Sequence, residues 1–255
     1  MPMPTDEDVT RFVEEGFVRI PGAVPRATAE RCAAELWEAS GFDPDDPSGW
    51  TKPVVRLGGM GTAPFREAAN TAVLHAAYDR LVGPGRWTAP LGLGTFPLRF
   101  PSDEDPGDDG WHVDAGFSGA GGEYRVDAHS RGRALLMLFL FSDVGPDDAP
   151  TRIRVGSHLD LPPLLAGAGQ GGRDWFALCQ EAAAISESRP EAAATGAAGD
   201  VYLCHPFLVH AAQRHRGRVP RFLAQPPLVP VGPLDLSGTA PTPVERAVLD
   251  GLGVR

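Results

Sequence analysis

The segment Trp111-His112-Val113-Asp114 places an imidazole and a carboxylate two positions apart. On a β-strand, side chains at i and i+2 lie on one face, so His112 and Asp114 could bind one metal ion while Val113 packs in the opposite layer. Two histidines and one carboxylate on one face of an octahedral ion leave three positions open, as in non-haem iron(II) oxygenases. Such a site requires a second histidine from elsewhere in the chain.

The His-x-Asp pattern is weak evidence by itself, because the chain contains it twice. The second copy is His158-Leu159-Asp160, and a histidine in such a short pattern is more often a surface or turn residue than a ligand. A zinc site built on Cys204, His205 and His210 is a further alternative, but it lacks another sound ligand. The choice between these sites therefore depends on the surrounding sequence.

The strongest signal is the stretch GDVYLCHPFLVH, residues 199–210, which is followed by Arg221 eleven residues after His210. This stretch resembles the phytanoyl-CoA dioxygenase family, whose members carry Gly-Asp, a short strand, a histidine ligand and an arginine at this distance. The resemblance extends to GFVRIPG near the N-terminus, RFP before WHVD, and VGSH after an apolar strand. It covers nearly the whole chain.

The resemblance implies that His112, Asp114 and His210 hold Fe(II), and that Arg221 grips the far carboxylate of the cosubstrate 2-oxoglutarate. The residues alone are consistent with this pairing, because a glycine-containing hairpin would bring His210, near one strand end, beside Arg221 on the next strand. A guanidinium can bind a carboxylate through two charge-assisted hydrogen bonds. The alternative for Arg221 is a solvated arginine at a strand end.

Arg99, Arg152 and Arg154 fall on predicted strands, where a buried guanidinium needs an anionic partner. Arg99 is our second candidate for cosubstrate binding, and ion pairs with the many aspartates are the alternative for all three. The family often has a hydroxyl residue two positions after the distal histidine, where this chain has Ala212. Arg221 must therefore find another helper or bind the cosubstrate alone.

The elements that must position these residues divide the chain into a helical part (1–85), a β core (86–230) and a closing helix (243–252). Thr5 predicts the start of a first helix that ends at Gly16. A strand over 17–20, a helix ending near Gly41 and a helix over 66–81 should follow. The predicted core strands are 96–100, 110–114, 134–144, 152–155, 200–204, 207–211 and 221–224.

The run ALLMLFLF, residues 134–141, does not alternate, which is typical of a strand covered on both faces. Gly (31) and Pro (26) are frequent, which favours a loop-rich β fold. Long loops are predicted at 101–109, 115–133 and 161–191, the last with a helix near 175–184. The glycine-rich loop 115–133 is expected to be a mobile lid. We predict a mainly β chain with flanking helices, and the resemblance implies a double-stranded β-helix (jelly-roll, cupin-like) core in one domain, 1–255.

The net charge of -10 and the pI near 5.1 oppose binding to nucleic acid or to an anionic membrane surface. Three cysteines without CxxC spacing indicate neither a disulfide framework nor a zinc knuckle. The N-terminal residues show no targeting pattern, and the longest apolar run is too short to span a bilayer. These features predict a cytoplasmic monomer or weak homodimer that acts on a small molecule.

The resemblance implies that 2-oxoglutarate and O2 react at Fe(II) and that an aliphatic C–H bond is hydroxylated. Desaturation, epimerisation or ring formation could use the same residues, and a catalytically inactive jelly-roll binding protein is a second alternative. Asp114 argues against a halogenase, and a cupin-like dioxygenase without cosubstrate leaves Arg221 unexplained. Acidic residues before the iron strand disfavour acyl-CoA esters and favour a secondary metabolite or an amino-acid-like molecule: Asp103, Glu104, Asp105, Asp108 and Asp109.

Overall fold

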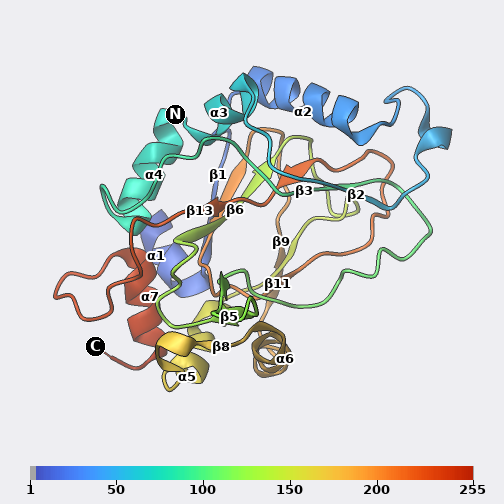
Figure 1. Cartoon of the computed structure of the whole chain (residues 1–255). Coiled ribbons are helices and arrows are strands. Elements are labelled where there is room, and N and C mark those ends of the chain that lie inside the picture. Colours follow the sequence, from blue (N-terminus) through green and yellow to red (C-terminus); the bar gives the residue numbers. More distant parts are fainter. Residues whose placement is uncertain (1–3, 255) are drawn as a thin grey trace.

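A five-stranded antiparallel sheet forms the centre of the molecule, with helices packed around it (Figure 1). The computed structural model describes residues 4–254, so positions 1–3 and 255 of the predicted domain lie outside the described part. The strands of the central sheet, in spatial order, are β1 (Phe17–Ile20), β10 (Val201–Cys204), β6 (Leu135–Leu140) and β12 (Leu223–Ala224), with β13 (Pro227–Leu228) paired to another part of β6.

Strand β6 is buried along its whole length, as its unbroken apolar sequence predicts. Successive side chains of a strand point to opposite faces, and here each face meets a different core. Met137 and Phe139 pack in the larger core. Four helices complete this core: α1 (Asp6–Glu15), α2 (Arg26–Ser40), α4 (Ala72–Val82) and α7 (Pro243–Gly251). Leu138 and Leu140 pack in a smaller core with Ile153 of the second sheet. The central sheet thus separates a helical layer from a second β layer.

The second β layer contains three short strands in the order β11, β7, β9. Two smaller sheets complete the β structure: β2 pairs with β3, and β5 lies between β4 and β8. The bounds of these strands are β2 (Val54–Leu57), β3 (Phe96–Arg99), β4 (Phe117–Ser118), β5 (Tyr124–Val126), β7 (Arg152–Arg154), β8 (Arg173–Asp174), β9 (Glu191–Ala193) and β11 (His210–Ala211).

The helices begin and end largely where the sequence predicts. Thr5 forms a capping box with Asp8 at the start of α1, and the left-handed Gly16 ends it. The predicted single helix over 66–81 is wrong: the chain forms α3 and α4, because Thr71 caps a new helix by accepting a hydrogen bond from the Leu74 amide. The bounds are α1 (Asp6–Glu15), α2 (Arg26–Ser40), α3 (Ala63–Ala69), α4 (Ala72–Val82), α5 (Leu161–Leu165), α6 (Trp175–Ile185) and α7 (Pro243–Gly251), with 3-10 turns η1 (Pro47–Gly49), η2 (Ser157–Leu159) and η3 (Gly169–Gly171).

Two predictions about the β structure need correction. The part of the chain over 1–85 is not only helical: the predicted strand over 17–20 is confirmed as β1 of the central sheet, and β2, which was not predicted, pairs with β3. The predicted strand over 110–114 is reduced to a single bridge at His112, and the strands predicted over 207–211 and 221–224 shorten to β11 and β12. Glycines and prolines interrupt the pairing around these segments, so strand periodicity extends over fewer residues than predicted.

The loop over 115–133 carries β4 and β5, and β5 pairs with β8 at the start of α6. This loop is therefore ordered as a small sheet, and its predicted mobility stays a prediction. Within residues 4–254, no helix is both long and apolar enough to cross a membrane.

Candidate metal centre

His112 and His210 lie directly opposite each other on antiparallel segments. The amide of His112 donates to the carbonyl of His210, and the amide of His210 donates to the carbonyl of His112, both at 3.0 Å. This reciprocal pairing directs both imidazoles to the same side, and the ring centroids are 4.4 Å apart. Two residues almost a hundred positions apart in the sequence are thus held together by backbone hydrogen bonds.

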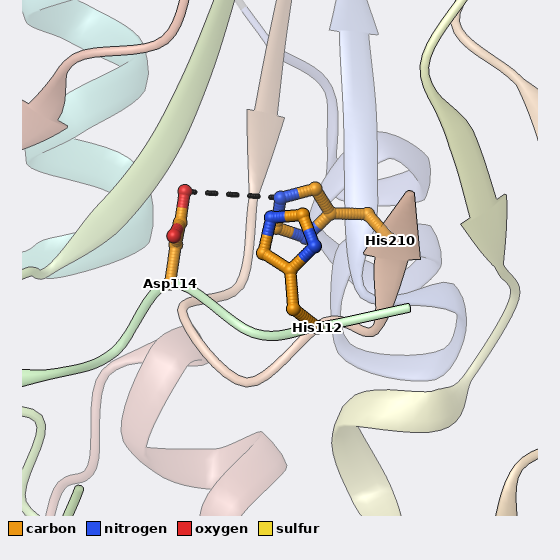
Figure 2. Close-up of side chains that lie close together, drawn as sticks. All are labelled: His112, Asp114 and His210. Atoms are coloured by element: carbon orange, nitrogen blue, oxygen red, sulfur yellow. Dashed lines mark ion pairs between the residues drawn. The ribbon is translucent and has the colours of Figure 1, made fainter. Parts of the chain in front are cut away.

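Asp114 completes the cluster from the loop that follows His112. Its Oδ2 lies 3.7 Å from Nε2 of His210, and one ligand atom of each of the three residues lies within 4.8 Å of the others. Figure 2 shows the Asp114 carboxylate pointing toward the two imidazole rings. The sequence motif thus converges with His210, although Asp114 lies outside any strand.

Hydrogen bonds determine which ring nitrogen each histidine offers. Nδ1 of His112 lies 2.9 Å from the carbonyl oxygen of Gly110, and Nδ1 of His210 lies 3.0 Å from that of Leu208. A carbonyl can only accept, so each Nδ1 carries the proton and each Nε2 presents a lone pair. This is the arrangement in which neutral histidines bind metals, with Nδ1–H orienting the ring.

The protonation states of the cluster suit a cation. Burial, together with the adjacent His112, lowers the pKa of His210 to about 4, so its imidazole is neutral at pH 7. Burial opposes ionisation of Asp114, but the nearby Arg133 guanidinium outweighs it and holds the pKa of that carboxyl below its usual value. The site thus presents a carboxylate beside the neutral imidazole of His210.

Nε2 of His210 is the observation that a metal ion explains. This buried atom has no hydrogen-bond partner, and its lone pair faces the Asp114 carboxylate. An unprotonated nitrogen beside a carboxylate oxygen is unfavourable in a buried site unless a cation lies between them. A donor set of two imidazoles and one carboxylate fits a divalent ion such as Fe(II).

A cavity of about 290 Å³ adjoins the cluster on the side of His210 and contains the two predicted arginines. Arg99 and Arg221 face each other across reciprocal backbone hydrogen bonds of 3.0 and 2.8 Å, so their side chains enter the cavity together. Nη2 of Arg99 lies 2.7 Å from Oδ2 of Asp108, which also contacts Arg56. One of the two buried guanidinium groups therefore has a carboxylate partner.

Arg221 has no such partner among the described residues. Its Nη1 and Nη2 donate to the carbonyls of Ala149 and Pro97 at 2.5 and 3.1 Å, and its buried Nε has no partner. The side chain is 1% exposed. Burial and the neighbouring Arg99 lower the pKa of Arg221 to about 9, which leaves it charged at pH 7. A buried charge of this kind is stabilised by an anion in the cavity.

The predicted hairpin between His210 and Arg221 is wrong. β11 pairs with β7 in the second sheet, whereas β12 pairs with β6 in the central sheet. The connecting segment crosses from one sheet to the other, and both residues line the same cavity because the two sheets face each other there. The predicted proximity is confirmed, and the reason is tertiary packing.

Polar groups that could assist Arg221 come from outside the family motif. Ala212 lines the cavity and offers no hydroxyl, as the sequence indicates. Thr151, which precedes β7 and is buried, lines the same cavity, and so does Gln225 after β12. The hydroxyl and the carboxamide can donate hydrogen bonds to an anion, so Arg221 need not bind alone.

Arg152 and Arg154 are engaged elsewhere. Both guanidinium groups lie over the ring of Trp111, at 4.6 and 4.2 Å from its centroid. Arg152 also donates to the carbonyl of Asp109 at 3.2 Å, and Arg154 to that of Ala183. Neither residue lines the cavity that contains Arg221. Of the three arginines on predicted strands, Arg99 alone reaches it.

The alternative ligand sets do not assemble. His158 donates toward the carbonyl of Val13, while Asp160 pairs with Arg189 at 3.0 and 2.5 Å. His205 is buried between the Val244 carbonyl and the Phe207 amide. Within residues 4–254, the single group of three potential ligands is His112, Asp114 and His210.

Sequence reasoning missed Arg133 and the residues of α6. Nη2 of Arg133 lies 4.0 Å from Oδ2 of Asp114, and its buried Nη1 has no partner. Trp175 donates from Nε1 to the carbonyl of Val113 at 2.7 Å and thereby braces the segment that carries the ligands. Arg133 directly precedes the longest apolar run, and a charge at the edge of a buried strand was the one available signal.

Several solved structures are similar to this chain in fold. The epimerase SnoN, solved with Fe3+, alpha ketoglutarate and nogalamycin RO, is 18% identical, with 93% of this chain and 92% of that chain covered and a TM-score of 0.58. HygX from Streptomyces hygroscopicus, solved with nickel and 2-oxoglutarate, is 20% identical over 87% and 85%, with a TM-score of 0.55. EctD from S. alaskensis, solved with 2-oxoglutarate and 5-hydroxyectoine, is 21% identical over 88% and 75%, with a TM-score of 0.55.

At these identities the solved structures show a shared fold. No curated protein matches the chain. The sequence model of the phytanoyl-CoA dioxygenase family matches residues 12–223, which includes both histidines, Asp114 and Arg221. The chain therefore belongs to the phytanoyl-CoA dioxygenase (PhyH) family of non-haem oxygenases, which depend on Fe(II) and 2-oxoglutarate.

Proposed function

We propose that His112, Asp114 and His210 bind Fe(II), and that Arg221 binds the far carboxylate of 2-oxoglutarate in the adjoining cavity. One observation carries this proposal: a buried guanidinium without an anionic partner lies in the cavity that borders a buried, unpartnered imidazole nitrogen. A cation on one side and an anion on the other satisfy both groups. 2-Oxoglutarate bound to iron supplies both at once.

The residues of the chain hold and orient the reactants. Bound Fe(II) supplies the chemistry that activates O2 with 2-oxoglutarate. The Nδ1–H bonds of His112 and His210 keep both Nε2 atoms directed into the site. Arg221 sets the depth at which the dicarboxylate lies, while Asp108 neutralises Arg99 and reduces the repulsion between the two arginines. The buried setting strengthens these charge interactions.

We further propose that the two facing sheets form a double-stranded β-helix (jelly-roll) core and that residues 1–255 fold as one catalytic domain. The opposed central and second sheets support this, since one core lies between them. Hydroxylation of an aliphatic C–H in a small molecule is the reaction that we propose. Epimerisation is the second candidate, because SnoN, which covers 93% of the chain, is named an epimerase.

The test is the conversion of 2-oxoglutarate to succinate by the purified protein. We expect conversion that requires Fe(II), stops with a chelator, and is accompanied under argon by a visible absorption band when 2-oxoglutarate binds the Fe(II) protein. The matched control is Asp160→Asn, which alters the second His-x-Asp copy and should leave both signals intact. A protein that binds Fe(II) but gives neither band nor succinate would contradict the proposal.

A further inference from the structure

A second hollow borders the candidate metal centre, and most of its lining residues differ from those of the arginine cavity. It has a volume of about 620 Å³ and lies between α6 and the segment over 107–114. His112 and Asp108 line both hollows, His210 lines the arginine cavity, and Asp114 lines the second hollow. A molecule in each hollow would thus approach the same metal ion from a different side.

The two hollows differ in volume, and this difference indicates which reactant each can hold. The arginine cavity holds about 290 Å³ and contains two buried guanidinium groups, which suits a small dicarboxylate. The second hollow has about twice that volume and includes Asp114, so a larger molecule can lie against the metal ligands there. This division leaves the second hollow for the molecule that is oxidised.

Aromatic rings form the walls of the second hollow, and two of them are held in place. The indole of Trp175 is fixed by its hydrogen bond to the Val113 carbonyl, and Trp111 lies beneath two arginine side chains. Phe176 packs edge-on against Trp175 at 4.8 Å and is 71% exposed at the opening. Fixed aromatic faces bind flat rings well, because little side-chain freedom is lost on binding.

The described residues that line the hollow offer no cationic side chain to an anion. Among the described residues that line it, none is a lysine or an arginine, and Asp108 and Asp114 are both present. Exposed Asp109 adds a further carboxylate in the segment that forms the wall. Arg133 is close, but its guanidinium faces the Asp114 carboxylate. Arg152 and Arg154 lie over the ring of Trp111 and do not line the hollow. An anion would therefore find no cationic partner in the described lining, whereas a neutral molecule needs none.

We propose that this aromatic hollow is the substrate site and that it takes a neutral, flat, ring-containing molecule. The inference rests on the proposed function, since it assigns the second reactant of the same metal centre. It narrows the substrate from small metabolites in general to those with a planar, largely apolar ring system. An acyl-CoA, a sugar phosphate and a free acidic amino acid would each lack a cationic partner among the described residues of this lining.

Three probes of similar size test shape and charge separately: 2-naphthol, its saturated analogue 2-decalol, and 2-naphthoate. Binding is measured by calorimetry on the Fe(II) protein with 2-oxoglutarate under argon, so no turnover is needed. We expect 2-naphthol to bind at least about tenfold more tightly than either of the other two. Phe176→Ala should weaken 2-naphthol binding by about tenfold. Leu91→Ala truncates another exposed apolar side chain, which lines a different apolar hollow, and should leave 2-naphthol binding unchanged.

Equal affinity for 2-naphthol and 2-decalol would overturn the inference, because the site would not recognise a flat ring. Tighter binding of 2-naphthoate than of 2-naphthol would also overturn the inference, because the site would then prefer an anion to a neutral molecule. Loss of 2-naphthol binding in Leu91→Ala would show that the probe binds in the other hollow, and it would overturn the inference. The absorption band of the 2-oxoglutarate complex, recorded on the same samples, separates the two proposals. If the band forms and 2-naphthol is not preferred, the substrate inference alone fails; if no band forms, the proposed function fails and the inference with it.

Discussion

The two His-x-Asp segments have the same residue spacing and entirely different surroundings. The first is extended at His112, where a backbone bridge to His210 directs the imidazole into the metal centre. The second forms the 3-10 turn η2, in which His158 points into the helical layer and Asp160 turns outward to Arg189. In a turn of three residues, positions i and i+2 do not share a face. Backbone conformation, more than residue spacing, therefore separates a ligand pair from a structural pair.

Signals for this difference exist in the local sequence. Gly156 precedes the second copy and adopts φ +76°, where a side chain would be strained and would collide with Arg189. A proline at the start of α5 follows it. The first copy is followed by Ala115 and Gly116, and Gly116 leaves room for the ring of Tyr124. Turn and helix signals around the second copy thus argue against a strand there.

The largest expected difference in turnover is between the variants that lack the carboxylate of the first copy and of the second copy. We expect Asp114→Ala to reduce 2-oxoglutarate turnover to below about one thousandth, since a charged metal ligand contributes several kcal/mol. Asp160→Ala should leave turnover unchanged and cost at most about 1 kcal/mol of stability, because its ion pair with Arg189 is partly exposed. Succinate release and chemical denaturation measure the two effects. Comparable turnover in both variants would contradict the assignment of the first copy, and not the second, as the metal pair.

The next largest effect is a loss of 2-oxoglutarate affinity when Arg221 is replaced. This expectation assumes that the first copy holds the metal ion. A two-pronged charge-assisted contact is lost in Arg221→Ala, so 2-oxoglutarate affinity should fall by on the order of a hundredfold. Iron affinity should be retained, since the three ligands remain. The exposed Arg218 provides the matched control, and Arg218→Ala should bind 2-oxoglutarate normally. Calorimetry with and without the metal checks both statements, and unchanged affinity in Arg221→Ala would remove it as the clamp.

Substitution of the two histidines should affect different properties. His158→Gln should lower stability, and His112→Gln should weaken iron binding. His158→Gln is expected to lower the free energy of unfolding by about 2 to 3 kcal/mol, because it disturbs a fully buried ring bonded to Val13. Iron binding should persist. His112→Gln should instead weaken iron binding and change the stability of the metal-free protein little. Denaturation in the presence of a chelator, together with iron titration, tests both; iron loss in His158→Gln alone would reverse our assignment.

The smallest effect is a pH dependence that belongs to the second copy. Burial lowers the pKa of His158 from 6.5 to about 4. As the pH falls below 6.5, the unfolded chain takes up a proton that the folded protein refuses, so the stabilisation present above pH 6.5 is lost as the pH approaches 4. The slope from this group reaches about 1.4 kcal/mol per pH unit. The free energy of unfolding should therefore differ less between pH 7 and pH 5 in His158→Gln than in the parent protein, as denaturation curves at the two pH values can show.

Much of the fold could be predicted because local interactions specify it. The capping box of Thr5, the left-handed Gly16 and the unbroken apolar run of β6 each act within a few residues, and all three are confirmed. The split of α3 from α4 was missed because Thr71 competes as a cap inside an otherwise helical pattern. The strand β2 was missed because its pairing with β3 is long-range, and no local signal required it.

The sequence alone determined the candidate ligands, the arginine and the family, because spacing and residue type are local properties that the family motif records. Only the tertiary structure decided how these residues meet. His112 reaches His210 through one backbone bridge, and Arg221 reaches the same cavity through a second bridge, to Arg99. The aromatic hollow, finally, is formed by α6 and the segment over 107–114, which are distant in sequence. Contacts of this kind follow from the packing of layers, which no local pattern encodes.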